Sequence, residues 1–165
     1  MVQEETIKGK LAEAIVRCMF EDLGFEVISY GYENTCPTIA KKYHTIKGDV
    51  KNLIRKAPDF IIVDKENNAY FIEVKYRKNG EYTKESDYPF EDCYIILLTG
   101  EYIGIEQYKN LPKGKITVTG ANFGKYTKGN FKEGGFKSLM DVPLFQNVDK
   151  DTVLKYREQV MKYMK

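Results

Sequence analysis

Residues 57–78 read APDFIIVDKENNAYFIEVKYRK, and the pattern of this segment is the most informative one in the chain. Two runs rich in β-branched and aromatic residues, Asp59–Val63 and Ala69–Tyr76, flank the polar turn Lys65–Asn68. Short apolar runs separated by a polar turn are typical of paired strands. The stretch therefore predicts a β-hairpin.

The second of these strands carries an acid and a base two residues apart. Residues two apart in a strand share a face, so Glu73 and Lys75 should point the same way. Asp59 stands at the start of the neighbouring strand. Two carboxylates converging from adjacent strands form an all-oxygen site suited to Mg²⁺, and a nearby ammonium can orient an attacking water. The alternative is an exposed Glu73–Lys75 pair facing water, with Asp59 simply ending a turn.

On either side of this hairpin, the chain alternates helical and extended patterns without a linker or internal repeat. We expect a single domain spanning residues 1–165. The remaining predicted elements are a helix over 3–23, strands over 25–30, 94–99 and 116–119, a basic loop before the hairpin, and a C-terminal helix over 152–165. The run YIILLT is almost wholly apolar, which predicts a strand covered on both faces near the centre of the sheet.

The residues Pro58, Asp59, Glu73, Val74 and Lys75 resemble the signature of the PD-(D/E)XK nuclease superfamily. That resemblance implies an α/β fold with a restriction endonuclease-like core, a central mixed β-sheet flanked by helices in the order αβββ-β. The family usually places a second core helix after the third strand. Here RKNGEYTKESDYPFED has no apolar stripe, so we expect that helix to be reduced or absent.

The resemblance also implies roles for individual residues. Asp59, Glu73 and the carbonyl of Val74 would bind Mg²⁺, with Mn²⁺ as a substitute, and Lys75 would lie near the attacking water. The segment KGKLAEAIVRCMFEDLGFEV is similar to the first helix of archaeal Holliday junction resolvases, and its Glu13 would support the metal or the water. The alternative for Glu13 is a surface ion pair with Arg17, one helical turn later.

Positive charge is gathered into two segments. The net charge is only +2, yet residues 41–56 and 113–137 each carry +5, which leaves −8 on the rest of the chain. The second segment interleaves glycines and aromatic residues with its lysines, which favours contact with phosphates and bases, although its aromatics could equally cover the core. The candidate nucleic-acid-binding residues are Lys41, Lys42, Lys47, Lys51, Arg55, Lys56, Lys125 and Lys128.

Composition excludes several classes of site and protein. Three cysteines without a Cys-x-x-Cys pair exclude the usual structural zinc sites, and one histidine, His44, excludes sites built on paired histidines. His44 lies among lysines and is expected in a solvated turn. No apolar run approaches the roughly 20 residues that span a bilayer, and the start lacks a signal-like apolar core. We therefore expect a cytoplasmic protein with no membrane partner.

These patterns together predict a metal-dependent endonuclease that hydrolyses phosphodiester bonds of DNA. DNA rather than RNA is implied by the resemblance alone. If the enzyme is structure-specific, like a resolvase, or of the restriction type, it should form a homodimer, because symmetric cleavage of two strands needs two sites. Two other functions stay open: a non-catalytic nucleic-acid-binding module with a vestigial site, and a protein-interaction domain that binds no nucleic acid.

Overall fold

The computed structural model describes residues 3–31, 37–42, 44–101, 103–117 and 135–165. It is an α/β fold built on a six-stranded mixed sheet in the order β1-β2-β3-β5-β6-β8. The strands are β1 (Glu26–Ser29), β2 (Phe60–Val63), β3 (Ala69–Tyr76), β5 (Tyr94–Leu98), β6 (Ile103–Gln107) and β8 (Lys137–Ser138). Only the β3–β5 pair in this sheet is parallel.

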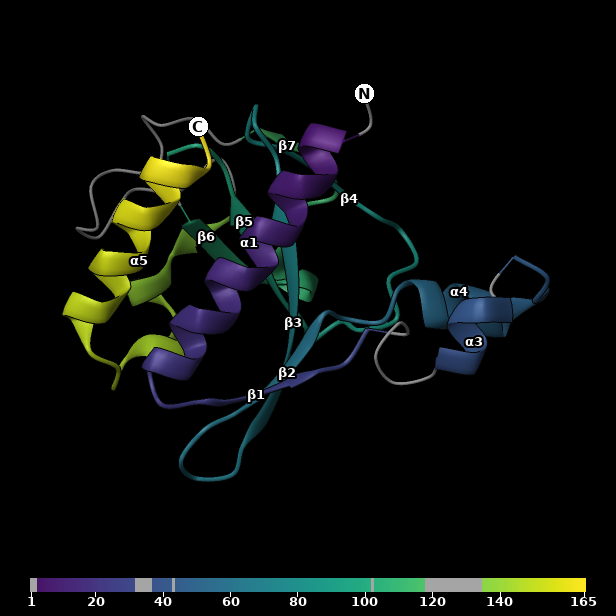
Figure 1. Cartoon of the computed structure of the whole chain (residues 1–165), viewed down its shortest axis with the longest axis horizontal. Helices are drawn as coiled ribbons and strands as arrows, with labels where there is room; N and C mark the ends of the chain where they lie inside the picture. Colours follow the sequence, from purple (N-terminus) through teal and green to yellow (C-terminus); the bar gives the residue numbers. More distant parts are fainter. Residues whose placement is uncertain (1–2, 32–36, 43, 102, 118–134) are drawn as a thin grey trace.

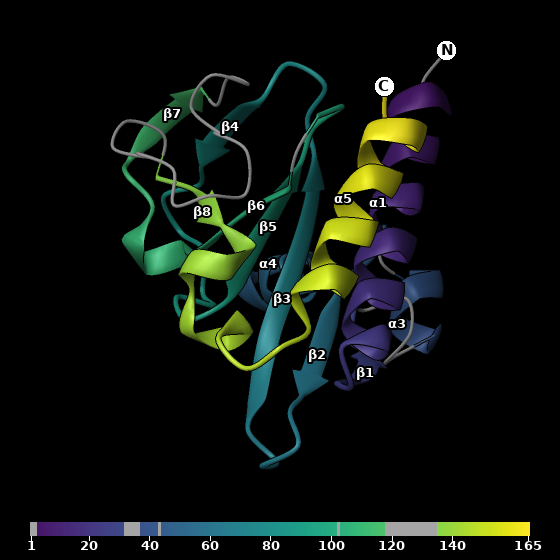
Figure 2. The ribbon, with the colours of Figure 1, turned by 90° about the vertical axis from the view of Figure 1, so that its left-hand side faces the viewer.

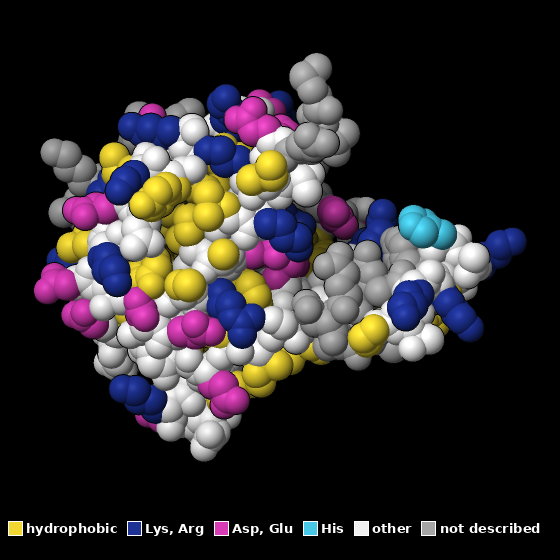
Figure 3. All heavy atoms as spheres, in the orientation of Figure 1, with side chains coloured by type: hydrophobic (Ala, Val, Ile, Leu, Met, Phe, Trp, Pro, Cys, Tyr) yellow, Lys and Arg dark blue, Asp and Glu magenta, His cyan; other side chains and the backbone are white. Residues whose placement is uncertain are grey.

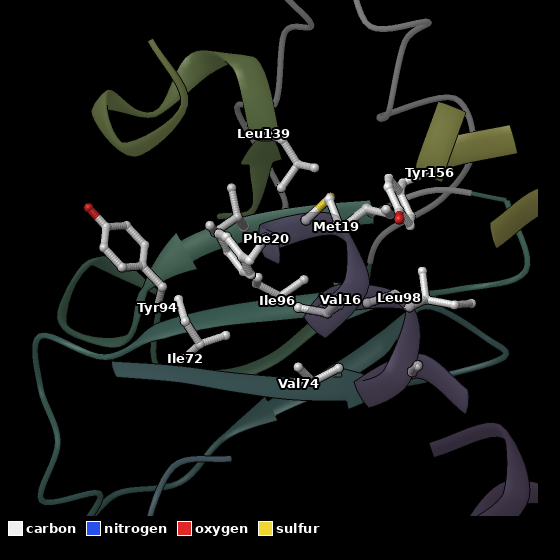
Figure 4. Packing of buried hydrophobic residues seen from close by; sticks show 14 of the residues in the cluster. Val16, Met19, Phe20, Ile72, Val74, Tyr94, Ile96, Leu98, Leu139 and Tyr156 are labelled. Atoms are coloured by element: carbon white, nitrogen blue, oxygen red, sulfur yellow. The ribbon is translucent and has the colours of Figure 1, made fainter. Parts of the chain in front are cut away.

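Two long helices cover one face of the sheet (Figures 1 and 2). They are α1 (Gln3–Asp22) and α5 (Lys150–Tyr163), and α5 begins where the Asp149 carboxylate accepts a hydrogen bond from the Thr152 backbone at 3.1 Å. Figure 4 shows how apolar residues of α1 meet those of β3 and β5. Val16, Met19, Phe20, Ile72, Val74 and Ile96 belong to this first core cluster.

The opposite face of β5 packs against a second, two-stranded sheet formed by β4 (Glu81–Lys84) and β7 (Gly114–Thr117). A second apolar cluster joins Ile95 and Leu97 of β5 to Tyr82 of β4 and Ile116 of β7. All five residues of β5 are buried, which confirms the prediction of a strand covered on both faces.

The structure corrects the sequence-based assignment in three places. The stretch expected as a basic loop contains two short helices, α3 (Pro37–Lys42) and α4 (Asp49–Arg55). The strands β4, β6 and β8 were not predicted, and the strand expected at 116–119 pairs with β4 rather than with the main sheet. Residues 77–93, all of which are described, contain β4 and no helix, in line with the expected loss of the second core helix.

The helices α3 and α4 extend away from the body at the end of the sheet where β1 finishes and β2 begins (Figure 1). We call residues 37–56 the basic arm. Between α3 and α4, His44 is exposed in a turn, as the sequence predicts. Within the described ranges, no helix is long and apolar enough to cross a membrane.

Candidate functional site

Strand pairing brings Asp59 and Glu73 side by side. In the β2–β3 hairpin Phe60 lies opposite Ile72, so the residue before β2, Asp59, falls opposite Glu73. Asp59 is fixed from both sides: its carboxylate oxygen Oδ2 accepts a hydrogen bond from the Val74 backbone at 2.8 Å, and its carbonyl accepts one from Tyr30 at 2.9 Å. The predicted meeting of the two carboxylates at this end of the hairpin is therefore present.

Glu73 and Lys75 form an ion pair on one face of β3, as their spacing predicts. Lys75 Nζ lies 2.5 Å from Glu73 Oε1, and the side chains are 34% and 12% exposed. The alternative of a solvated surface pair is wrong, because Glu73 is largely buried. Its second oxygen, Oε2, is buried and has no hydrogen-bond partner among the described residues. An unpartnered buried carboxylate oxygen is costly, which leaves this atom available to a ligand.

Burial controls the electrostatics of this pair of carboxylates. It raises the pKa of Asp59 to about 7, with the nearby charge of Glu73 adding to the effect. Burial also raises the pKa of Glu73, and the Lys75 ammonium opposes that rise. Both carboxyl groups are therefore harder to ionise than usual, and a cation bound between them would stabilise their charged forms.

Glu13 projects from α1 toward the same place. Its side chain is 28% exposed and pairs with Lys10 at 3.1 Å rather than with Arg17. Arg17 instead binds Glu21 at 3.0 Å and donates to the Ser29 hydroxyl at 2.6 Å. The Glu13–Arg17 pair considered from the sequence is therefore wrong. The charge of Glu13 contributes to the raised pKa values of Asp59 and Glu73, so it lies within electrostatic reach of both.

A hollow of about 440 Å³ opens onto these carboxylates between α1 and the base of the arm. It is lined by Glu13, Asp59 and Glu73 together with three cations, Lys10, Arg17 and Arg55. Figure 3 shows acidic and basic side chains next to each other where the arm meets the body. Lys10 and Arg17 were not among the predicted site residues, although the sequence places both beside Glu13 on the helix. Their signal was a position one turn to either side of Glu13 on the same helix.

A second hollow, of about 990 Å³, lies on the other side of Glu13 and Lys75. Its wall is of mixed charge: Glu5, Glu81 and Glu85 lie there together with the cations Lys75, Arg77 and Lys78. In the part of the chain that the structure describes, no three His, Cys, Asp or Glu side chains are grouped closely enough to hold a metal by themselves. Any divalent ion here would rely on two carboxylates, backbone oxygen and water, as Mg²⁺ commonly does.

The predicted nucleic-acid-binding residues differ in how exposed they are. Four of them, Lys41, Lys42, Lys47 and Arg55, are exposed on the arm, and Lys51 is half-buried. Lys56 is an exception, because its side chain is only 13% exposed and pairs with Glu85 at 3.6 Å. Its ammonium is already paired with the loop that joins β4 to β5, so Lys56 is less accessible to a phosphate than the exposed cations of the arm.

The second basic segment, residues 113–137, is described only at its two ends. Lys125 and Lys128 lie outside the described residues. Phe136 is 1% exposed within the second core cluster, so this aromatic covers the core and does not stack on bases.

No protein-family model matches the chain, and no curated protein matches it significantly.

Proposed function

We propose that this protein is a metal-dependent endonuclease that hydrolyses phosphodiester bonds of DNA, with a core related to the PD-(D/E)XK nucleases. The observation that carries the proposal is the junction of β2 and β3, where Asp59 accepts from the Val74 backbone and Glu73 pairs with Lys75. The order of strands also supports it: three antiparallel strands follow a helix, and the next strand of that sheet runs parallel to the third.

The donor set fits Mg²⁺. Asp59, Glu73 and the Val74 carbonyl would hold it, since the N–H and C=O of one strand residue point to the same side and the Val74 N–H points to Asp59. The Glu73 Oε2 atom, buried and unpartnered in the described structure, supplies a carboxylate oxygen with no competing hydrogen bond. When bound, Mg²⁺ would lower the pKa of a water and neutralise charge on the phosphate.

The chain's own residues would divide the remaining work. Lys75, held by Glu73, would orient the attacking water and stabilise the negative charge that develops on the phosphate. Glu13 would accept a hydrogen bond from that water. On the other side, Lys10, Arg17 and Arg55 line the hollow and would bind the phosphates that flank the cleaved bond.

Charge favours one path for the nucleic acid. The exposed cations of the basic arm continue outward from Arg55, whereas the exposed acids Glu85, Asp87, Glu91 and Asp92 lie on the loop that joins β4 to β5. Phosphate is attracted to the first surface and repelled from the second. The substrate would therefore enter along the arm, and symmetric cleavage of two strands would need a second copy of the chain.

A cleavage assay tests the proposal. Supercoiled plasmid incubated with Mg²⁺ should be nicked by the wild type and left intact by Glu73→Ala and Lys75→Ala, and chelation should abolish nicking. Intact plasmid with unchanged, salt-sensitive binding would instead support a non-catalytic nucleic-acid-binding module. Binding that does not weaken as salt rises, or no binding at all, would contradict a phosphate-binding role.

A further inference from the structure

Helix α4 of the basic arm is attached to the body with little apolar burial. It has no buried residue, and Val50 and Leu53 are 61% and 51% exposed. Burial of such side chains is the usual source of rigid attachment of a helix to a body. The polar contacts at the base of the arm therefore matter more than they would for a packed helix.

Lys56 makes such a contact at the point where the arm joins β2. Its Nζ donates to the Asp87 carbonyl at 3.2 Å and lies 3.6 Å from a carboxylate oxygen of Glu85. The Lys56 side chain is 13% exposed, whereas its partner Glu85 is 60% exposed, so the lysine is the more enclosed member of this pair. The preceding residue, Arg55, is exposed and lines the hollow that contains the carboxylates. Arg55 and Lys56, although adjacent in sequence, therefore lie against two different surfaces.

The segment that receives Lys56 is itself firmly attached. The Tyr108 hydroxyl donates to the Glu85 carbonyl, and the rings of Tyr88 and Tyr108 lie 4.7 Å apart. Ring contacts continue from Tyr88 to Phe90 at 5.6 Å and from Phe90 to Phe71 at 5.3 Å. Phe71 is on β3, two residues before Glu73 and on the same face. The contacts of Lys56 therefore link the arm to the strand that carries the site.

We propose that Lys56 is a positioning residue that holds the basic arm against the body so that Arg55 lies at the hollow. Lys56 acts through Arg55 and does not contact nucleic acid itself. This inference rests on the proposed function, because it assigns Arg55 to a phosphate of the substrate. A Lys56 that itself contacted a phosphate would release its own counterion on binding, independently of Arg55. The two roles therefore predict different numbers of counterions released by the single and double variants.

The salt dependence of binding separates the two roles. Binding of a duplex oligonucleotide is measured without divalent metal, so that no cleavage occurs, at several salt concentrations. Each lost phosphate contact should reduce the slope of log K against log salt by about 0.9. We expect Arg55→Ala and Lys56→Met each to lose about one contact, the double variant to lose no more than either single variant, and Lys56→Arg to keep the wild-type slope.

Other slopes would overturn the proposal. If the slope falls about twice as much in the double variant as in either single variant, Lys56 is an independent phosphate contact. If the slope is unchanged in Lys56→Met or in Arg55→Ala, Lys56 does not act through Arg55. Unfolding by denaturant shows that the variants are folded.

Hydrogen exchange tests the positioning role without nucleic acid. The backbone amides of residues 49–55 should exchange faster in Lys56→Met and in Glu85→Gln, and at the wild-type rate in Arg55→Ala. Unchanged exchange in Lys56→Met would refute the positioning role, whatever the protein binds. If exchange changes as expected but the wild type does not bind the duplex, both the assignment of Arg55 to a phosphate and the proposed function are wrong. The role of Lys56 in holding the arm to the body would still stand.

Discussion

Removing the charge of Asp59 should stabilise the folded protein at high pH. Burial raises the pKa of this carboxyl from its ordinary value of 3.8 to about 7, so ionisation in the folded state is unfavourable. A tenfold change in an acid dissociation constant corresponds to about 1.4 kcal/mol, which sets a ceiling of about 4 kcal/mol for the penalty at pH 8. In Asp59→Asn the side-chain oxygen can still accept the Val74 hydrogen bond, but no charge is buried.

The penalty develops as the pH rises. The folded protein retains its proton on Asp59 between about pH 4 and pH 7, where the unfolded chain has lost it, so the wild type loses stability as pH rises through this range. Asp59→Asn lacks that loss. We expect the variant to unfold with a free energy about 2 to 4 kcal/mol higher at pH 8 and nearly equal to wild type at pH 4.

Urea denaturation followed by circular dichroism at both pH values measures the effect. Asp64→Asn is the matched control at the other end of β2: hydrogen bonds from Asn68 lower the pKa of Asp64, so this variant should lose stability at pH 8. Saturating Mg²⁺ should stabilise the wild type and not Asp59→Asn. A difference between wild type and Asp59→Asn that does not change with pH, or a variant less stable than wild type at pH 8, would show that the folded protein bears no such penalty at Asp59.

Three further substitutions, one of them with a matched control variant, test the site and the core. Lys75→Met should slow single-turnover cleavage by about 10²- to 10⁴-fold without weakening duplex binding, because Lys75 lies at the carboxylates and not on the arm, whereas Lys65→Met in the distant hairpin turn should cleave normally. Equal losses in both lysine variants would contradict this role. Ile96→Ala, at the fully buried centre of β5, should lower the unfolding free energy by about 2–5 kcal/mol, and a smaller loss would show that the core repacks around the gap. Lys137→Met should lower the free energy of unfolding by about 1–3 kcal/mol, because the buried side chain of Glu106 would lose its charged partner. Glu106 is 6% exposed and lies 3.0 Å from Lys137 Nζ. An unchanged denaturation midpoint would mean that the hydrogen bonds from the Gln107 backbone and the Asn110 amide are enough to stabilise Glu106.

The hairpin and its carboxylates could be predicted because their signals are local. Alternation along Ala69–Tyr76 fixes which side chains share a face, and the polar turn before it fixes the pairing that places Asp59 opposite Glu73. The apolar run of β5 was likewise sufficient to indicate a covered strand.

The elements that the sequence did not reveal depend on distant partners. The strand β4 is extended because it pairs with β7, about thirty residues later, and β6 buries Glu106 because Lys137 reaches it from β8. Lys56 shows the same limit at a single position. Its charge placed it among the nucleic-acid-binding candidates, but its partners on residues 85 and 87 are set by the tertiary fold.

Asp59 and Glu73 should share one divalent cation, and anomalous diffraction from a crystal soaked in Mn²⁺ would locate that ion. We predict one anomalous peak between the two carboxylates, within bonding distance of the Val74 carbonyl, and its loss in crystals of Glu73→Gln. Well-ordered wild-type crystals with no peak there, or with Mn²⁺ bound only elsewhere, would contradict the claim.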